Sequence, residues 1–212
     1  MELQPLELQP VDLEHVELQH LDVTLPATAP PGFDAGEVIP VFHEWVGAQA
    51  HETLLVDVAD YRHVPGGPGV VLIGHEADYA LDCGAPGLAL RYRRKAALPG
   101  GNADRLAQAL RATLQAAERL AAEPALAGRI AFALHGLRLV VNDRLLAPNT
   151  ARTAAALLPE LEDWVTGARG HEEFSLVWDS EPRHRFGVTL YTTRPTVLPA
   201  VLLAVLARLG AS

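Results

Sequence analysis

The sequence predicts an α+β domain in which a mostly antiparallel sheet carries helices packed on one face. Two observations lead to this fold class. Apolar and polar residues alternate in short segments such as residues 88–94, and this period of two is typical of antiparallel strands with one solvated face. After a first helix and strand, the order strand, strand, helix occurs three times with short turns, which favours hairpins over parallel crossovers. A chain of 212 residues, 49% of them hydrophobic, can bury one such core.

An acidic arm is expected in front of this domain. Residues 1–20 read MELQP, LELQP, VDLEH and VELQH, a five-residue repeat of alternating apolar and polar positions. Residues 24–33 contain three prolines, which predict a stiff, extended linker. We therefore expect an arm and linker over residues 1–33 and a single domain over residues 34–212. The arm is either a mobile low-complexity segment or an extended strand that adds to a sheet edge, where Pro5 and Pro10 are tolerated.

The first elements of the domain are a short helix and a strand. Asp34 and Glu37 have the spacing of a capping box, and the apolar stripe after them predicts a helix that ends near residue 50. Residues 53–59 have the continuous apolar centre of a strand. Residues 70–82 follow a Pro/Gly loop and contain two apolar runs around a polar turn, so we expect this stretch to be a central piece of the sheet.

The next elements are a strand, a long helix and a hairpin. Residues 88–94 alternate cleanly as a strand. Asn102 is the expected cap of a strong helix, whose apolar face ends before Pro124. A hairpin is expected between residues 129–134 and 137–143, around the pair His135-Gly136. The run Asn142-Asp143-Arg144 is interpreted as the exit of this hairpin, with a local ion pair.

The last third of the chain predicts a helix, a second hairpin and a final helix. Asn149 or Thr150 starts the first of these helices, which is expected to kink or restart at Pro159. Residues 174–178 and 186–190 alternate as the two strands of a hairpin. Thr196 then caps a helix that ends at Gly210.

Charge and composition exclude several classes of protein. The formal net charge is −9, and residues 1–60 hold 12 of the 26 acidic residues but no lysine or arginine. No basic face of the size that nucleic acids require is expected. The single cysteine, Cys83, permits no internal disulfide and fits a reducing compartment, so we expect a cytoplasmic protein. The longest apolar run, residues 197–207, is shorter than the roughly 20 residues of a membrane span.

Histidines and acids gather around residues 57–78, where imidazole and carboxylate groups could hold a metal ion or transfer protons. The candidate metal ligands are Asp57, Asp60, His63 and His75, and the candidate catalytic residues are His63, His75, Glu76 and Asp78. In a regular strand, neighbouring side chains point to opposite faces, so His75 and Glu76 can share a site only if the chain bends between residues 74 and 78. A metal-assisted hydrolase is the alternative function that this cluster indicates.

A basic run at the end of the strand over residues 88–94 is the candidate anion-binding site. It consists of Arg91, Arg93, Arg94 and Lys95. An anionic ligand could bind there, and so could the acidic arm of this chain or of a neighbouring copy, because opposite charges attract. An anion-binding module is the third function that the sequence suggests.

No specific catalytic motif accompanies these clusters. Cys83 follows Asp82, and an adjacent acid disfavours a reactive thiolate. There is no G-x-S-x-G sequence, and no cofactor is required, although a divalent metal would suit the His/acid cluster. The sequence therefore favours a non-catalytic binding or assembly module whose acidic arm docks on a protein partner or on a second copy. Deleting residues 1–30 is then expected to leave a folded body and to weaken assembly.

Overall fold

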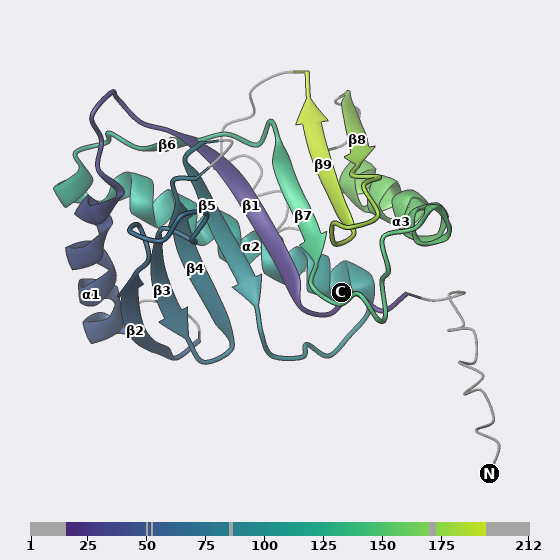
Figure 1. Cartoon of the computed structure of the whole chain (residues 1–212), viewed down its shortest axis with the longest axis horizontal. Coiled ribbons are helices and arrows are strands. Elements are labelled where there is room, and N and C mark those ends of the chain that lie inside the picture. The colour runs from purple at the N-terminus through teal and green to yellow at the C-terminus, as the bar shows by residue number, and fades with distance from the viewer. Residues whose placement is uncertain (1–15, 50, 52, 85–86, 170–172, 194–212) are drawn as a thin grey trace, which may run out of the picture.

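A computed structural model describes residues 16–49, 51, 53–84, 87–169 and 173–193. Over these residues the chain forms one antiparallel sheet of nine strands with three α-helices (Figure 1). The strand order is β2-β3-β4-β5-β1-β7-β9-β8, and the short strand β6 pairs with one end of β1. The prediction of an α+β domain with a mostly antiparallel sheet is confirmed.

The bounds of these elements follow the chain. The strands are β1 Leu21–Thr28, β2 Leu55–Asp60, β3 Val70–Gly74, β4 Ala77–Asp82, β5 Ala89–Arg94, β6 Ala131–Phe132, β7 Leu137–Val141, β8 Phe174–Trp178 and β9 Gly187–Thr192. The helices are α1 Val38–Ala48, α2 Asn102–Ala122 and α3 Ala151–Arg169, with short 3₁₀ turns at Ala35–Glu37 and Pro124–Leu126.

Strand β1 lies in the middle of the sheet, which corrects the expected organisation of the N-terminal region. It pairs with β5 on one side and with β7 on the other. The expected linker over residues 24–33 therefore begins with strand residues, and the folded body starts well before Asp34. The physical reason is the alternation of Leu21, Val23 and Leu25, whose side chains are at most 2% exposed. Their burial favours a strand covered by neighbours over an exposed edge.

Pro26 fits into this central strand because its missing N–H falls in a gap of the hydrogen-bond ladder. Strand β7 pairs with β1 only as far as Thr24, and β6 pairs with it from Ala27 onward. On the side of β1 that faces β6 and β7, the Ala133 N–H donates to the Pro26 carbonyl (3.0 Å). In an antiparallel ladder the N–H and C=O of one residue point to the same side. Proline therefore removes no sheet hydrogen bond at this position.

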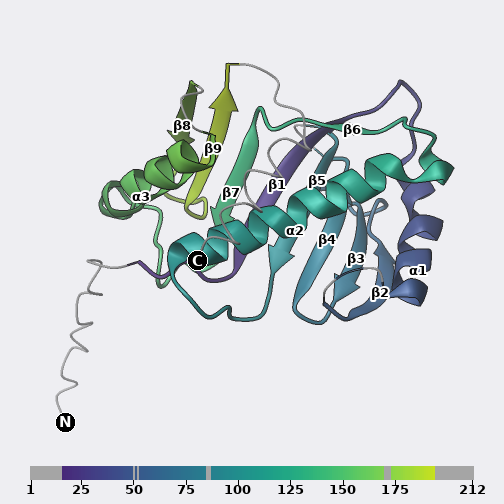
Figure 2. The same cartoon turned by 180° about the vertical axis from the view of Figure 1, so that it is seen from behind.

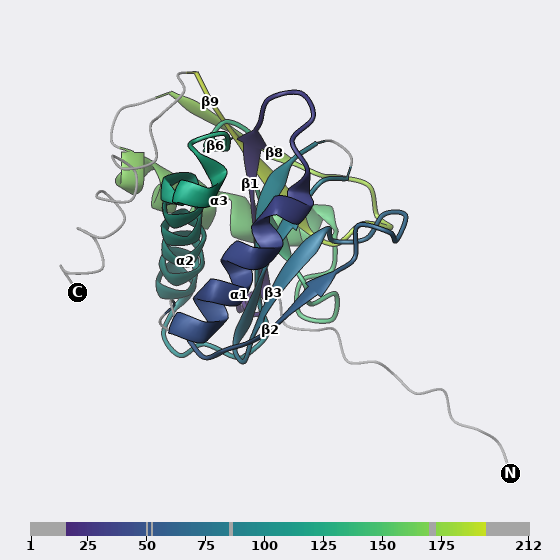
Figure 3. The same ribbon diagram turned by 90° about the vertical axis from the view of Figure 1, so that its left-hand side faces the viewer.

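The helices supply the second layer of the domain. Helix α2 packs against β1 and β5, α1 against β2 and β3, and α3 against β8. Figure 2 shows α2 and α3 in front of the strands, and Figure 3 shows α1 and α2 from the end of the sheet where β2 and β3 lie. The buried face of α2 includes Leu106, Leu110, Leu114 and Leu120, as its sequence predicts. Among the described residues, no helix is long and apolar enough to cross a membrane.

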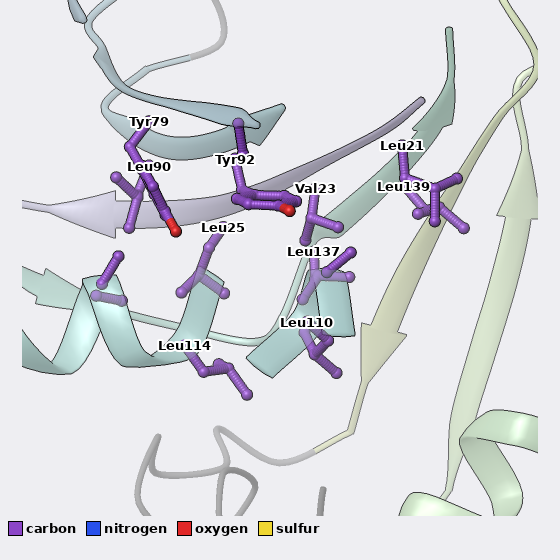
Figure 4. Close-up of a cluster of buried hydrophobic side chains, with 14 of the residues drawn as sticks. Leu21, Val23, Leu25, Tyr79, Leu90, Tyr92, Leu110, Leu114, Leu137 and Leu139 are labelled. Atoms are coloured by element: carbon purple, nitrogen blue, oxygen red, sulfur yellow. The ribbon is translucent and has the colours of Figure 1, made fainter. Parts of the chain in front are cut away.

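The hydrophobic core lies between these helices and one alternating set of strand side chains. Figure 4 shows Val23, Leu25 and Tyr92 on the strands near Leu110 and Leu114 of α2. The other alternating set, on β4, β5, β1, β7 and β9, forms the opposite side of the sheet, which we call the open face. This division positions the candidate site, because the charged residues of the central strands lie mainly on the open face.

Several local predictions need correction. Strand β6 pairs with β1 and not with β7, so the expected hairpin over residues 129–143 is wrong. Asn102 is the first residue of α2, and its backbone neighbour Gly101 occupies the cap position. Helix α3 is continuous through Pro159, so of the two expected alternatives, a kink or a restart, the restart is wrong. The order strand, strand, helix is seen twice, as β4-β5-α2 and β6-β7-α3, and the helix expected over residues 196–210 lies outside the described residues.

Candidate functional site

A groove lined with arginines crosses the open face. Its volume is about 520 Å³. The basic residues that line it come from β5, from β7 and from the segments that flank β7 and β9, and they are Arg91, Arg93, Arg138, Arg144, Arg183, His184 and Arg185. Two acids, Asp22 and Asp82, also line it. We call this feature the arginine groove.

The strand period places three of these arginines. Arg91 and Arg93 alternate with the core residues of β5, and Arg138 occupies an open-face position of β7 on the other side of β1. Between them lies Asp22 of β1, which is 4% exposed. Its carboxylate accepts from Nε and Nη2 of Arg93, both at 3.1 Å. A buried carboxylate needs such a partner, so Arg93 neutralises Asp22 at the floor of the groove. Its guanidinium group is therefore only partly available to a ligand.

The loop between β8 and β9 completes the groove from a distant part of the sequence. Asp179 lies at its start and accepts from Arg138 Nη2 (2.7 Å), and its Oδ2 is 2.9 Å from Nδ1 of His184. The hydrogen bond from Arg138 is the main reason why the pKa of Asp179 lies below its usual range. These contacts fasten the loop to β7 and hold His184 and its neighbours at the rim.

The charges of the groove do not balance. Six arginines face two aspartates within it, a surplus of four positive charges, and Asp179 at the rim lowers this surplus to three. Arg91 pairs with Asp82 at 3.5 Å. In the described part of the chain, by contrast, Arg144, Arg183 and Arg185 have no carboxylate partner. Arginines of this kind can offer their fixed fork of donors to a carboxylate or phosphate.

Arg144 also corrects a local prediction. The ion pair expected within Asn142-Asp143-Arg144 is not among the contacts of the described residues. Instead, Arg144 Nη2 donates to the carbonyl oxygen of Arg183, and Arg185 Nη1 donates to the side-chain oxygen of Asn142. Both acceptors are neutral, so the positive charges of Arg144 and Arg185 are not cancelled there.

A second hollow adjoins the arginine groove and shares Arg93, Arg144 and Arg185 with it. Arg94 and Lys95, the other two predicted anion-binding residues, line this hollow together with His20. Both of these basic side chains are paired with an acid. The Arg94 side chain is 8% exposed and pairs with Glu76 (3.0 Å), while Lys95 pairs with Asp78 (2.6 Å). Of the four predicted residues, Arg91 therefore lines the arginine groove, Arg94 and Lys95 line the second hollow, and Arg93 lines both. The uncompensated charge lies on other arginines, which were not predicted as anion-binding residues.

The fourth copy of the five-residue repeat, Val16 to His20, is docked on the body. Val16 and Leu18 are at most 4% exposed and belong to the core. The acid of this copy, Glu17, pairs with Arg105 of α2. Gln19 exchanges hydrogen bonds with the backbone of Leu98, both at 3.0 Å. The repeat therefore has a defined way of binding to a folded surface: its apolar residues are buried and its acid meets an arginine.

Asn102 fixes this copy. Its Oδ1 accepts from the N–H of Leu18 (2.8 Å), and its Nδ2 donates to the carbonyl of Val16 (2.8 Å) and to Glu160 (2.9 Å). The first copies, residues 1–15, lie outside the described residues. Since His20 lines the second hollow, the docked copy ends at the rim of the basic surface.

Three acids of the predicted His/acid cluster form ion pairs with neighbouring basic residues. The tight hairpin between β3 and β4 does provide a bend at His75 and Glu76, as a shared site would need. Glu76 and Asp78, however, pair with Arg94 and Lys95 across to β5. Asp60 pairs with Arg62 (2.7 Å), and mainly for that reason its pKa is lowered to about 2.

The predicted metal ligands do not converge. Asp57 accepts a hydrogen bond from the backbone N–H of Val58 (2.8 Å), and His63 and His75 are exposed in turns. Across residues 16–193, leaving aside the gaps in the description, no three His, Cys, Asp or Glu side chains lie close enough to hold a metal ion. The candidate metal ligands around residues 57–78 therefore form no such metal-binding group among the described residues.

His51 is the most perturbed histidine of the described chain. Its ring lies between those of Trp45 and Tyr79, with centroid distances of 5.0 and 4.7 Å. Its Nε2 is buried without a hydrogen-bond partner among the described residues. Burial, together with the charge of Arg119, lowers the pKa of His51 to about 4. The ring is therefore neutral in the folded protein near pH 7 and packs as part of an aromatic column.

The stability of the fold is consequently expected to fall as the pH drops from 6.5 to 4. In this window the unfolded chain takes up a proton at His51, whose ordinary pKa is 6.5, before the folded chain does. Urea unfolding at pH 7 and pH 5 measures the difference. The variant His51→Phe should show a weaker dependence over this window, which separates His51 from the carboxylates. Equal pH dependence in both proteins would contradict this assignment.

Comparison with models of protein families, with curated proteins and with solved structures finds no match to this chain.

Proposed function

We propose that this protein is a non-catalytic binding module whose arginine groove holds a carboxylate-bearing chain segment. We further propose that the acidic residues 1–15 of a second copy are this segment. The observation that carries the proposal is the surplus of positive charge on the open face, with three arginines that have no carboxylate partner in the described structure. A ligand with several negative charges would supply the missing partners.

The shape of the basic surface favours an extended segment over a single small anion. The arginine groove spans β5, β1, β7 and the loop before β9, and the second hollow continues from it through three shared residues. A small anion could contact only part of this surface. An extended chain with an acid every few residues would match successive arginines along it.

The N-terminal repeat has the required chemistry. Residues 1–15 contain four acids, Glu2, Glu7, Asp12 and Glu14, and no lysine or arginine. The docked fourth copy shows one binding mode for the same pattern, because Glu17 meets an arginine there. Copies one to three have an acid at the equivalent second position, so the same pairing with arginines is open to them.

A second copy can present this segment more directly than the same chain. Val16 and Leu18 are packed in the core on the helix side of the sheet, whereas the arginine groove lies on the open face. The segment before Val16 would have to pass around the end of the sheet to reach its own groove. The N-terminal segment of a neighbouring molecule can reach the groove without passing around the sheet. The resulting assembly would be concentration-dependent.

Binding of a labelled peptide tests the proposal. A fluorescent peptide of residues 1–15 is titrated into protein that lacks these residues, and anisotropy measures the affinity. The double variant Arg183→Glu/Arg185→Glu reverses two exposed charges without breaking an internal ion pair of the described structure. We expect it to weaken binding at least about tenfold, equivalent to about 1.4 kcal/mol, and we expect binding to weaken as salt is added.

A control is Arg152→Glu, which makes one such charge reversal at an exposed position of α3 outside the groove. It should leave the affinity within about twofold if the effect is local. Sedimentation of the full chain should show self-association that the double variant loses. Peptide binding that is unchanged in the double variant, or lost equally in Arg152→Glu, would overturn the proposal. If inorganic phosphate binds in the groove while the peptide does not, the module binds small anions instead.

A further inference from the structure

A third hollow of the molecule, separate from the two basic ones, is lined almost entirely by apolar atoms. It lies between α2 and α3, and its floor is formed by β1, β7, β9 and β8. Its lining consists of Val23, Leu106, Leu110, Leu134, Leu137, Leu139, Leu161, Trp164, Val165, Leu176, Val188 and Leu190. We call it the apolar groove. With almost no polar surface to hydrogen-bond water, such a groove is expected to be filled by apolar atoms.

The groove is deeply buried at one end and open at the other. Leu106 and Val188 are at most 5% exposed, whereas Trp164, Leu176 and Leu190 are half-buried. The partly exposed part of the groove is therefore formed by Trp164 of α3, Leu176 of β8 and Leu190 of β9. Covering these large side chains would remove further apolar surface from water, at roughly 25 cal/mol for each Å².

We propose that the chain's own C-terminal segment, residues 196–209, occupies the apolar groove as a helix. The first argument is position. Strand β9 ends at Thr192, and two residues of that strand, Val188 and Leu190, form part of the groove. The segment that follows therefore begins beside the groove, and only a short connection separates it from the binding surface.

The second argument is the sequence of the segment. Residues 197–209 read VLPAVLLAVLARL, in which only Arg208 is charged. A helix that is apolar around its whole circumference must be buried on more than one side. A groove with α2 on one side, α3 on the other and the sheet beneath provides contact of this kind. Fourteen helical residues span about 21 Å, a length that suits packing beside other helices.

The third argument is the order of elements. Strands β4 and β5 are followed by α2, and strands β6 and β7, which do not pair with each other, are followed by α3. Both helices pack on the core side of the sheet. Hairpin β8-β9 is the third pair in this series. A helix after it that packs on the same side would complete the series and fill the space between its two predecessors.

Exposure of Trp164 in the full-length chain tests the inference. The substitution Leu202→Asp places a charge in the middle of the apolar run, which a dry groove excludes. We expect acrylamide to quench Trp164 fluorescence at least twofold more efficiently in this variant, with the Trp164 signal obtained by difference from Trp164→Phe. The control Ala211→Asp adds the same charge beyond the apolar run and should not alter quenching.

Truncation after Thr193 gives a second measurement. The truncated protein should bind the apolar dye ANS several-fold more strongly, and a synthetic peptide of residues 194–212 should reverse this binding. The proposal is overturned if acrylamide quenches Trp164 fluorescence equally in Leu202→Asp and Ala211→Asp. It is also overturned if dye binding by the full chain rises on dilution, because a second copy would then be the occupant. Neither readout depends on the arginine groove.

Discussion

Removing residues 1–33 is expected to abolish folding, which reverses the expectation from sequence that deletion of residues 1–30 leaves a folded body. The deletion takes away β1 and the docked fourth copy of the repeat. Five side chains that are at most 4% exposed are lost with them: Val16, Leu18, Leu21, Val23 and Leu25. Their burial contributes roughly 7–15 kcal/mol, about as much as the whole free energy of unfolding of a typical domain. The deletion also leaves β5 and β7 without the strand that joins them.

A shorter deletion provides the comparison. A chain that begins at Val16 keeps β1 and the docked copy, and should therefore retain a cooperative thermal transition close to that of the full chain. Circular dichroism and thermal melting of both truncated proteins check the two outcomes. A cooperatively folded protein without residues 1–33 would show that β1 is dispensable and would contradict the central position of this strand.

Replacing Asn102 with alanine is expected to lower the free energy of unfolding by about 2–4 kcal/mol. The substitution leaves the buried N–H of Leu18 and the carbonyl of Val16 without partners. Each unsatisfied group costs about 1–3 kcal/mol. Helix propensity cannot offset this loss, because the substitution lies at the first residue of α2, where alanine brings little advantage. Urea unfolding measures the global effect.

Amide hydrogen exchange at Leu18 measures the local effect of the same change. Its N–H is bonded to Asn102 in the folded protein and should exchange much faster in the variant. The matched control is Glu160→Gln, which alters only the contact between Asn102 and α3 and should cost less than about 1 kcal/mol. Unchanged protection of Leu18 in Asn102→Ala would show that other contacts hold the repeat in place.

The sequence predicts most elements of the sheet because the alternation of side chains is a local signal. The strands predicted over residues 88–94, 174–178 and 186–190 correspond to β5, β8 and β9, and β8 pairs with β9 as expected. The position of β1 is not local information. Proline at residue 26 indicates an edge or a linker when the neighbours are unknown, and only the gap between β7 and β6 makes it acceptable in the centre of the sheet.

The same distinction between local and non-local information applies to the residues of the candidate site. The period of two places Arg91 and Arg93 on one face of β5, and both line the arginine groove. The same period assigns Arg94 to the other face, where the structure has it beside Glu76. Arg138 carries a signal that sequence reasoning could have used, since it alternates with Leu137 and Leu139. The contribution of Arg183 and Arg185 depends on how the loop before β9 returns to β7, and no local pattern contains that information.

The His/acid cluster shows the opposite case, in which closeness in sequence does not produce a site. Four of its acids or histidines lie at strand ends or turns, where polar side chains are common for local reasons. Antiparallel pairing places β5 next to β4, so that Arg94 and Lys95 neutralise Glu76 and Asp78. Residue types alone could not distinguish this ionic pairing from metal ligation.

The place of β1 also sets the order in which the protein can be assembled during synthesis. Residues 21–28 leave the ribosome first among the strands, yet their two neighbours are formed by residues 89–94 and 137–141. The hairpins from β2 to β5 can pair as soon as they are made, but the two halves of the sheet can be joined only after β7 has been translated. Until β5 is made the leading strand has two unpaired edges, and until β7 is made it still has one. The nascent chain is therefore expected to need protection from aggregation over most of its synthesis.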